Sequence, residues 1–152
     1  MERALVVVDD SDANRELLAE AGQLARGVDA ELVLFSWVTP GEYDEDAETM
    51  EALETAEHAS YSGTDALDVA RNFARTLADD VFGDDAPAFD VTASVADDGE
   101  LADEILDAAS REDCDHVFVV GRRRSPTGKV IFGDVAQRII LNFDGPVTVV
   151  MG

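Results

Sequence analysis

The stretch that decides the fold begins Arg3-Ala4-Leu5-Val6-Val7-Val8-Asp9 and ends Ala30-Glu31-Leu32-Val33-Leu34-Phe35-Ser36-Trp37-Val38. Near-continuous apolar runs of this length are typical of strands buried on both faces of a parallel sheet. Asp10-Ser11-Asp12 follows the first run and offers several helix N-caps. Apolar residues then recur at helical spacing, at Leu17, Leu18, Ala21, Leu24, Ala25 and Val28. The stretch therefore predicts two parallel strands joined by a helix.

The rest of the chain repeats this alternation. Strands are predicted over Phe89–Ala96, His116–Val120 and Val147–Met151, and the first of these alternates apolar and polar residues as a half-exposed or edge strand does. Residues 42–62 fit either a mobile loop or the start of a helix. Three further helices are predicted from apolar stripes, namely Leu67, Ala70, Phe73, Ala74, Leu77 and Val81; Leu101, Ile105, Leu106 and Ala109; and Val135, Ile139, Ile140 and Phe143.

These elements predict one domain over residues 1–152. Strands that alternate with crossover helices form a parallel sheet covered on both sides. The expected fold is thus an open five-stranded parallel α/β sheet with helices on both faces. The third crossover helix is expected to start at a capping box, in which Asp97 pairs with Glu100 three residues later.

The charge of the chain is its most unusual bulk property. It carries 34 acidic and 11 basic residues, a net charge of −23, and Lys129 is its only lysine. So many carboxylates repel nucleic acid and anionic lipid, which excludes both as partners. The acid could form a face that binds a partner, or a solvated, halophilic surface suited to high salt. Its even spread along the chain favours the salt-adapted surface.

The sequence indicates a cytoplasmic protein. Cys114 is the single cysteine, so no disulfide can form within the chain, which fits a reducing compartment. No stretch approaches the roughly 18–20 apolar residues that span a bilayer. The N-terminus lacks the basic and long apolar regions of a signal peptide and fits a strand instead.

Three segments are expected to meet at the carboxyl edge of the sheet, where open parallel sheets bind ligands. They are Asp9-Asp10-Ser11, Val38-Thr39-Pro40, and the segment from Gly121 to Asp134. The third segment holds four of the 11 basic residues between Arg122 and Lys129, ahead of a predicted helix. Glycines before a helix N-terminus favour an anion, so the segment could cradle phosphate. Alternatively, its arginines pair with nearby carboxylates and tether the loop.

Three motifs in this order resemble the universal stress protein family over almost the whole chain. Val6-Val7-Val8-Asp9-Asp10-Ser11 is similar to the end of the family's first strand, and Gly145-Pro146-Val147-Thr148-Val149-Val150 is similar to its last strand. Val119-Val120-Gly121-Arg122-Arg123 looks like the start of its phosphate loop. The resemblance implies a Rossmann-like fold of the adenine nucleotide alpha hydrolase type.

The resemblance also implies a stress-response or regulatory domain that binds ATP or another adenine nucleotide, with Mg²⁺ as an accompanying ion. The family's ATP-binding loop has glycine, two residues, glycine, nine residues, glycine, then serine or threonine. Here Arg124 stands at the second glycine, Gly133 comes one residue early, and Asp134 replaces the hydroxyl residue. An ionised carboxylate cannot donate to phosphate and repels it. The implied nucleotide-binding residues are Asp9, Asp10, Val38, Gly121, Arg122, Arg124, Ser125, Gly128, Gly133, Asp134 and Val135.

The sequence contains no catalytic constellation, and slow ATP hydrolysis has the least support. Asp9 either contacts the nucleoside or structures the turn before the first helix. Asp9 and Asp10 could hold Mg²⁺, but no residue is assigned as a metal ligand, because His58 and His116 lack partners at metal-ligand spacing. Acidic neighbours should raise the pKa of Cys114 and leave its thiol inert.

The last strand suggests a second copy of the chain as a partner. Val147, Val149 and Met151 fall on one face of an unguarded apolar strand, which in the resembled family lies at the sheet edge and often pairs in a dimer. The alternative is that the chain's own helices shield it. Two functions are therefore open: a nucleotide-binding regulatory domain, and a homodimeric module that binds another protein and no nucleotide.

Overall fold

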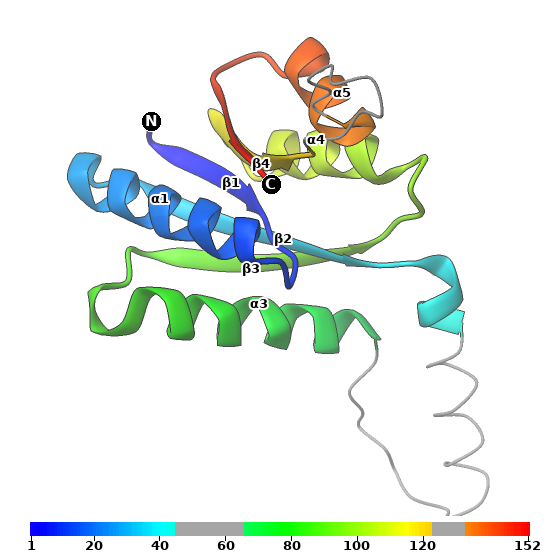
Figure 1. Cartoon of the computed structure of the whole chain (residues 1–152), viewed down its shortest axis with the longest axis horizontal. Coiled ribbons are helices and arrows are strands. Elements are labelled where there is room, and N and C mark those ends of the chain that lie inside the picture. The colour runs from blue at the N-terminus through cyan, green and yellow to red at the C-terminus, as the bar shows by residue number, and fades with distance from the viewer. Residues whose placement is uncertain (45–65, 123–132) are drawn as a thin grey trace, which may run out of the picture.

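The protein is described by a computed structural model covering residues 1–44, 66–122 and 133–152. Its sheet has five parallel strands in the order β3-β2-β1-β4-β5 (Figure 1). The elements along the chain are β1 Arg3–Val7, α1 Asp12–Val28, β2 Glu31–Val38, α3 Ala66–Phe82, a 3-10 turn Gly83–Asp85, β3 Phe89–Val95, α4 Leu101–Arg111, β4 His116–Gly121, α5 Asp134–Asn142 and β5 Val147–Met151.

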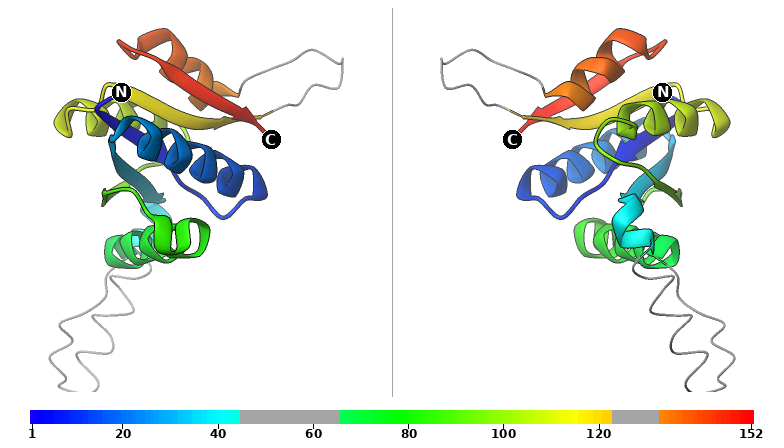
Figure 2. Two further views of the ribbon diagram at one scale, coloured as in Figure 1. Left: turned by 90° about the vertical axis from the view of Figure 1, so that its left-hand side faces the viewer. Right: turned by 90° about the vertical axis from the view of Figure 1, so that its right-hand side faces the viewer.

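The helices form one layer on each face of the sheet, as predicted. α1 and α3 cover one face, and α4 and α5 cover the other, which Figure 1 shows from the side. Phe118 and Leu34 belong to the first core and Phe35 and Ile139 to the second, and all four are fully buried. The side views in Figure 2 place α5 and β5 at the opposite end of the sheet from α3. The predicted α/β architecture is therefore confirmed.

Local hydrogen bonds fix where the helices begin. Of the candidate caps before α1, Ser11 takes the role, and its hydroxyl accepts the N–H of Asn14. The Asp97 carboxylate accepts the Glu100 N–H at 2.9 Å, in the turn before α4. This is the Asp97 half of the predicted capping box. Thr39 and Glu42 form a full capping box that sequence reasoning missed, at the start of a helical segment over residues 40–44. Most of the predicted segment 42–62 lies outside the described residues.

The predicted apolar stripes are wrong at their margins. Leu24 and Val28 of α1, Phe73 of α3 and Ile140 of α5 are 36–56% exposed, although each was assigned to a buried stripe. Each lies at the margin of its stripe, where the helix surface turns away from the sheet. The buried rows are instead completed by small residues that allow close packing, among them Gly22, Ala78, Ala102 and Ala108.

The two outer strands differ from the three inner ones. β3 and β5 end the sheet, and every residue of β5 is partly exposed, as is nearly every residue of β3. The edge position predicted for Phe89–Ala96 is thus confirmed. Within the described ranges 1–44, 66–122 and 133–152, no helix is long and apolar enough to cross a bilayer.

Candidate functional site

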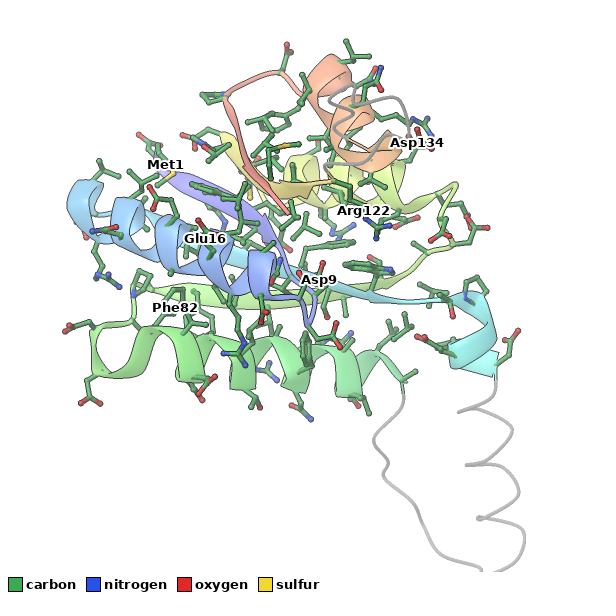
Figure 3. All side chains as sticks on the ribbon, viewed as in Figure 1. Met1, Asp9, Glu16, Phe82, Arg122 and Asp134 are labelled. Carbon is green, nitrogen blue, oxygen red and sulfur yellow. The ribbon has the colours of Figure 1, made fainter. Side chains whose placement is uncertain are left out.

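The strand order places a switch point between β1 and β4. The chain leaves β1 toward β2 and leaves β4 toward β5, so the two connections diverge, and open parallel sheets bind ligands in the crevice expected at such a point. Asp9 follows β1, and Arg122 follows the end of β4 at Gly121. In Figure 3, Asp9, Arg122 and Asp134 lie in this order along one side of the molecule, away from Met1. The predicted residues after β1 and β4 therefore share one edge of the sheet.

Asp9 structures the turn between β1 and α1. Its carboxylate oxygen accepts the Ser11 N–H at 2.7 Å, and Ser11 in turn caps the helix. Asp9 is partly buried, whereas Asp10 is exposed. The turn-forming role that the sequence allowed for Asp9 is thus present. A contact between Asp9 and a nucleoside remains a prediction.

Asn14 also holds this turn in place, and the sequence analysis did not predict this role. Its amide nitrogen donates to the Val7 carbonyl at 2.6 Å, which ties the first turn of α1 to the end of β1. The residue is 1% exposed, and its amide oxygen has no hydrogen-bond partner in the described structure. Its position could have indicated that it is buried. Asn14 lies three residues before Leu17 and four before Leu18, on the same buried side of α1.

The other side of the crevice is the start of α5. Gly133 precedes the helix with φ 87° and ψ 152°, a backbone region open almost only to glycine. It packs on Arg122, since a β-carbon at Gly133 would lie 3.6 Å from the β-carbon of Arg122. The start of α5 therefore lies beside the end of β4. Asp134 is the first residue of α5 and is exposed, as expected for a partner of the helix dipole.

The end of β5 lies at the same edge of the sheet. The Gly152 N–H donates to the Gly121 carbonyl at 2.8 Å. A β-carbon at Gly152 would lie 2.5 Å from that of Ala13 and 3.4 Å from the Val120 side chain. This close approach brings the start of α1, the end of β4 and the end of β5 together, and only glycine fits there.

The remaining predicted residues fall into three groups. Val38 is buried against α3, and its carbonyl accepts the Ala96 N–H at 2.9 Å. Val135 is partly buried against the core under α4 and α5. Arg124, Ser125 and Gly128 lie outside the described residues. Within the part of the chain that the structure describes, no three acidic, histidine or cysteine side chains gather as a metal site would require.

Cys114 and His116, which the sequence analysis considered as functional candidates, both have structural surroundings. Burial raises the pKa of the Cys114 thiol to about 11, with Glu112 and Asp115 adding to the effect and Arg3 opposing it. The predicted direction is correct, although burial is the larger cause. His116 is hydrogen-bonded through Nε2 to the Thr148 hydroxyl at 2.8 Å and stacks on Phe118.

The residues predicted at a dimer interface lie on the outermost strand. Val147 and Val149 of β5 pack partly against the core under α4 and α5, and Val150 packs on the opposite face. The side chains are thus partly shielded by the chain's own helices, while β4 is the only described neighbour of β5. Homodimerisation through β5 remains a prediction.

Several solved structures with the same fold are universal stress proteins. One from Archaeoglobus fulgidus is 27% identical with a TM-score of 0.64, over 99% of this chain and 98% of its own. Universal stress protein UspA from Lactobacillus plantarum is 21% identical with a TM-score of 0.67, over 98% and 97% of the two chains. An Archaeoglobus fulgidus universal stress protein in complex with dAMP is 22% identical with a TM-score of 0.59, over 99% and 98%.

Sequence comparison agrees with these structures. No curated protein sequence matches the chain. The sequence profile of the universal stress protein family matches residues 1–151, which covers every strand and helix of the fold. This chain therefore belongs to the universal stress protein family.

Proposed function

We propose that this chain is a stress-response or regulatory domain that binds an adenine nucleotide in the crevice between β1 and β4. One observation carries the proposal: Gly133 lies against the backbone and side-chain stem of Arg122, so the start of α5 stands beside a residue that carries a cation at the switch point. Free N–H groups at the start of α5 and the guanidinium of Arg122 both favour a phosphate. The nucleoside would lie toward Asp9.

Asp134 opposes this attraction. Its carboxylate stands at the first position of α5 and is exposed, so it repels a phosphate at the same helix end. Arg122 and Asp134 therefore act in opposite directions on one ligand. We infer weak binding, in the range that millimolar nucleotide would saturate. Asp9 and Asp10 are the carboxylates that would reach a Mg²⁺ ion on the phosphates.

The family supports an adenine nucleotide as the ligand class. A universal stress protein from Archaeoglobus fulgidus with the same fold has been solved with dAMP. That protein is 22% identical to this chain, so its ligand serves as the starting point for the proposal and no more.

Calorimetric titration with ATP and with AMP, in high salt and with or without Mg²⁺, tests the proposal. We expect saturable binding, tighter in Asp134→Ser and weaker in Arg122→Ala. Removing one like charge at close range should strengthen binding about tenfold. Asp79→Ser, on exposed α3 surface, removes the same charge elsewhere and is the matched control. Absence of saturable binding in both the original protein and Asp134→Ser would overturn the proposal.

A second candidate function is a homodimeric module that binds another protein and no nucleotide. The observation in its favour is the position of β5, a partly exposed apolar strand at the end of the sheet. Backbone groups on such an edge can pair with a second copy. The two functions are separable, because nucleotide titration and oligomer mass are measured independently.

A further inference from the structure

A groove lies between the start of α4 and one side of α5. Its volume is about 400 Å³, which falls within the range of roughly 300–1,000 Å³ usual for ligand pockets. The groove is open to solvent along its length. It is lined by Asp98, Gly99, Ala102, Asp134, Val135, Gln137, Arg138 and Leu141.

The α5 side of the groove exposes more apolar surface than the fold requires. Leu141 is 72% exposed, the largest exposed fraction among the large apolar side chains of the described residues. Ala102 and Val135 continue the apolar lining inward. Leu141 with Ala102 and Val135 gives the groove exposed apolar surface rimmed by polar residues, which is typical of a surface that a partner covers.

The charges around the groove are negative. Asp98 and Asp134 are exposed on its lining. Arg138 is the only cation among the lining residues, and its guanidinium is already engaged. It donates to the Gly99 carbonyl at 3.3 Å and to Asp103 at 3.2 Å. Among the described residues neither Asp98 nor Asp134 forms an ion pair, and the groove places both carboxylates near the apolar Ala102 and Val135.

We propose that this groove docks a basic segment of another protein. A large apolar side chain of the segment packs on Leu141, and lysine or arginine side chains on either side of it meet Asp98 and Asp134. Charge selects this occupant. A second copy of this chain would bring a net charge of −23 against the same carboxylates, and nucleic acid would bring phosphates against them.

The groove shares Asp134 and Val135 with the proposed nucleotide site, but the docking proposal depends on Leu141 and Asp98, which lie outside that site, and it is tested without nucleotide. The acidic residues of the whole surface attract basic peptides without specificity, so charge by itself does not define a site. Specific docking requires the apolar contact at Leu141. That contact can be removed without harm to the fold, because the side chain is mostly exposed and alanine is the better helix former.

The test is selection of short random peptides displayed on phage against the full chain, in about 0.15 M salt, where charges are screened beyond about 8 Å. We expect enriched peptides to carry lysine or arginine beside a large apolar residue. Leu141→Ala should weaken their binding about tenfold. Leu24→Ala removes another leucine from a helix surface, 41% exposed on α1, and should leave binding unchanged. Asp98→Asn should weaken binding and flatten its salt dependence, whereas Asp84→Asn, at an exposed position of the 3-10 turn, should have little effect.

Two outcomes would overturn the proposal. One is enrichment of peptides that bind Leu141→Ala and the original protein equally, which would leave only diffuse charge attraction. The other is a mass in solution that falls when Leu141 is changed, because a second copy would then cover the groove. Amide shifts of isotope-labelled protein on peptide addition should concentrate at Gly99, Ala102, Gln137 and Leu141.

Discussion

Gly133 lies against Arg122. A β-carbon added at Gly133 would be 3.6 Å from the Arg122 β-carbon and 3.7 Å from the Arg122 backbone nitrogen. The two residues bracket segment 123–132, so the chain returns to the point at which it left β4. This contact sets the start of α5 beside the end of β4. The proposed anion site depends on it, because the helix N-terminus attracts a phosphate only over its first turn.

Gly133→Ala should lower the free energy of unfolding by about 1–3 kcal/mol, because φ 87° with ψ 152° strains any residue that has a β-carbon. Steric overlap does not cause this loss, because the contacts of the added β-carbon with Arg122 are of ordinary van der Waals length. Denaturant unfolding measures the change. Gly27→Ala is the matched control, because a β-carbon there meets nothing within 4 Å, and it should be neutral or slightly stabilising. Equal changes in unfolding free energy for Gly133→Ala and Gly27→Ala would contradict backbone strain at position 133.

Gly22→Ala should be less stable than Gly27→Ala by about 1–3 kcal/mol, although both substitutions lie in α1. A β-carbon at Gly22 would overlap the ring of Phe82, where α1 packs on α3. Adding Phe82→Leu should recover part of the loss, and a double-mutant cycle measures that coupling. Strict additivity of the two substitutions would show that the ring does not limit position 22.

His116 should make stability depend on pH. Burial lowers its pKa below the ordinary value of 6.5; the charged N-terminus acts in the same direction and Asp115 opposes it. A histidine whose folded pKa is depressed gives its full contribution above pH 6.5. That contribution is lost as the pH falls from there toward the folded pKa, because the unfolded chain then binds more protons.

Comparison of the original protein with His116→Gln, by denaturant unfolding between about pH 5 and 8, isolates this contribution. Glutamine can still hydrogen-bond to Thr148, and both proteins share every carboxylate. The difference in unfolding free energy between the two proteins should shrink or change sign as the pH falls. A difference that stays constant with pH would rule out the titration of His116.

Met151→Lys should reduce the mass measured by sedimentation from that of a dimer to that of a monomer, if β5 pairs with its copy. A lysine on an exposed strand edge prevents pairing because its charge cannot be buried against the second copy. Leu24→Lys places the same charge on exposed α1 surface and should leave the mass unchanged. A monomer mass for the original protein would contradict dimerisation through β5.

Much of the fold could be predicted because its signals are local. The apolar runs at residues 3–9 and 31–38 indicate buried parallel strands, and the predicted stripe from Leu67 to Val81 falls within α3, Ala66–Phe82. Ser11 and Asp97 were recognised as turn and cap residues because their hydrogen bonds reach only three residues along the chain. Apolar runs, stripes and caps of this kind span only a few residues, so they depend on the periodicity of the local backbone.

The candidate site was predicted only in outline. The rule that ligands bind at a switch point brought Asp9, Arg122 and Gly133 to one edge without any coordinates. Asn14 was missed, since nothing nearby in the chain shows that its side chain would reach the Val7 carbonyl in a buried position. The exposure of Leu24, Phe73 and Ile140 was missed because a stripe does not reveal how far the sheet beneath extends.

The sequence by itself determined the family, the parallel α/β sheet and the position of its ligand edge, because periodicity and short motifs carry that information. Only the tertiary structure decided the contact of Gly133 with Arg122, the approach of Gly152 to Ala13 and the groove beside Leu141. Each joins residues from different elements, and its geometry depends on how the helices pack on a twisted sheet. That packing is a property of the whole chain, which no short stretch encodes.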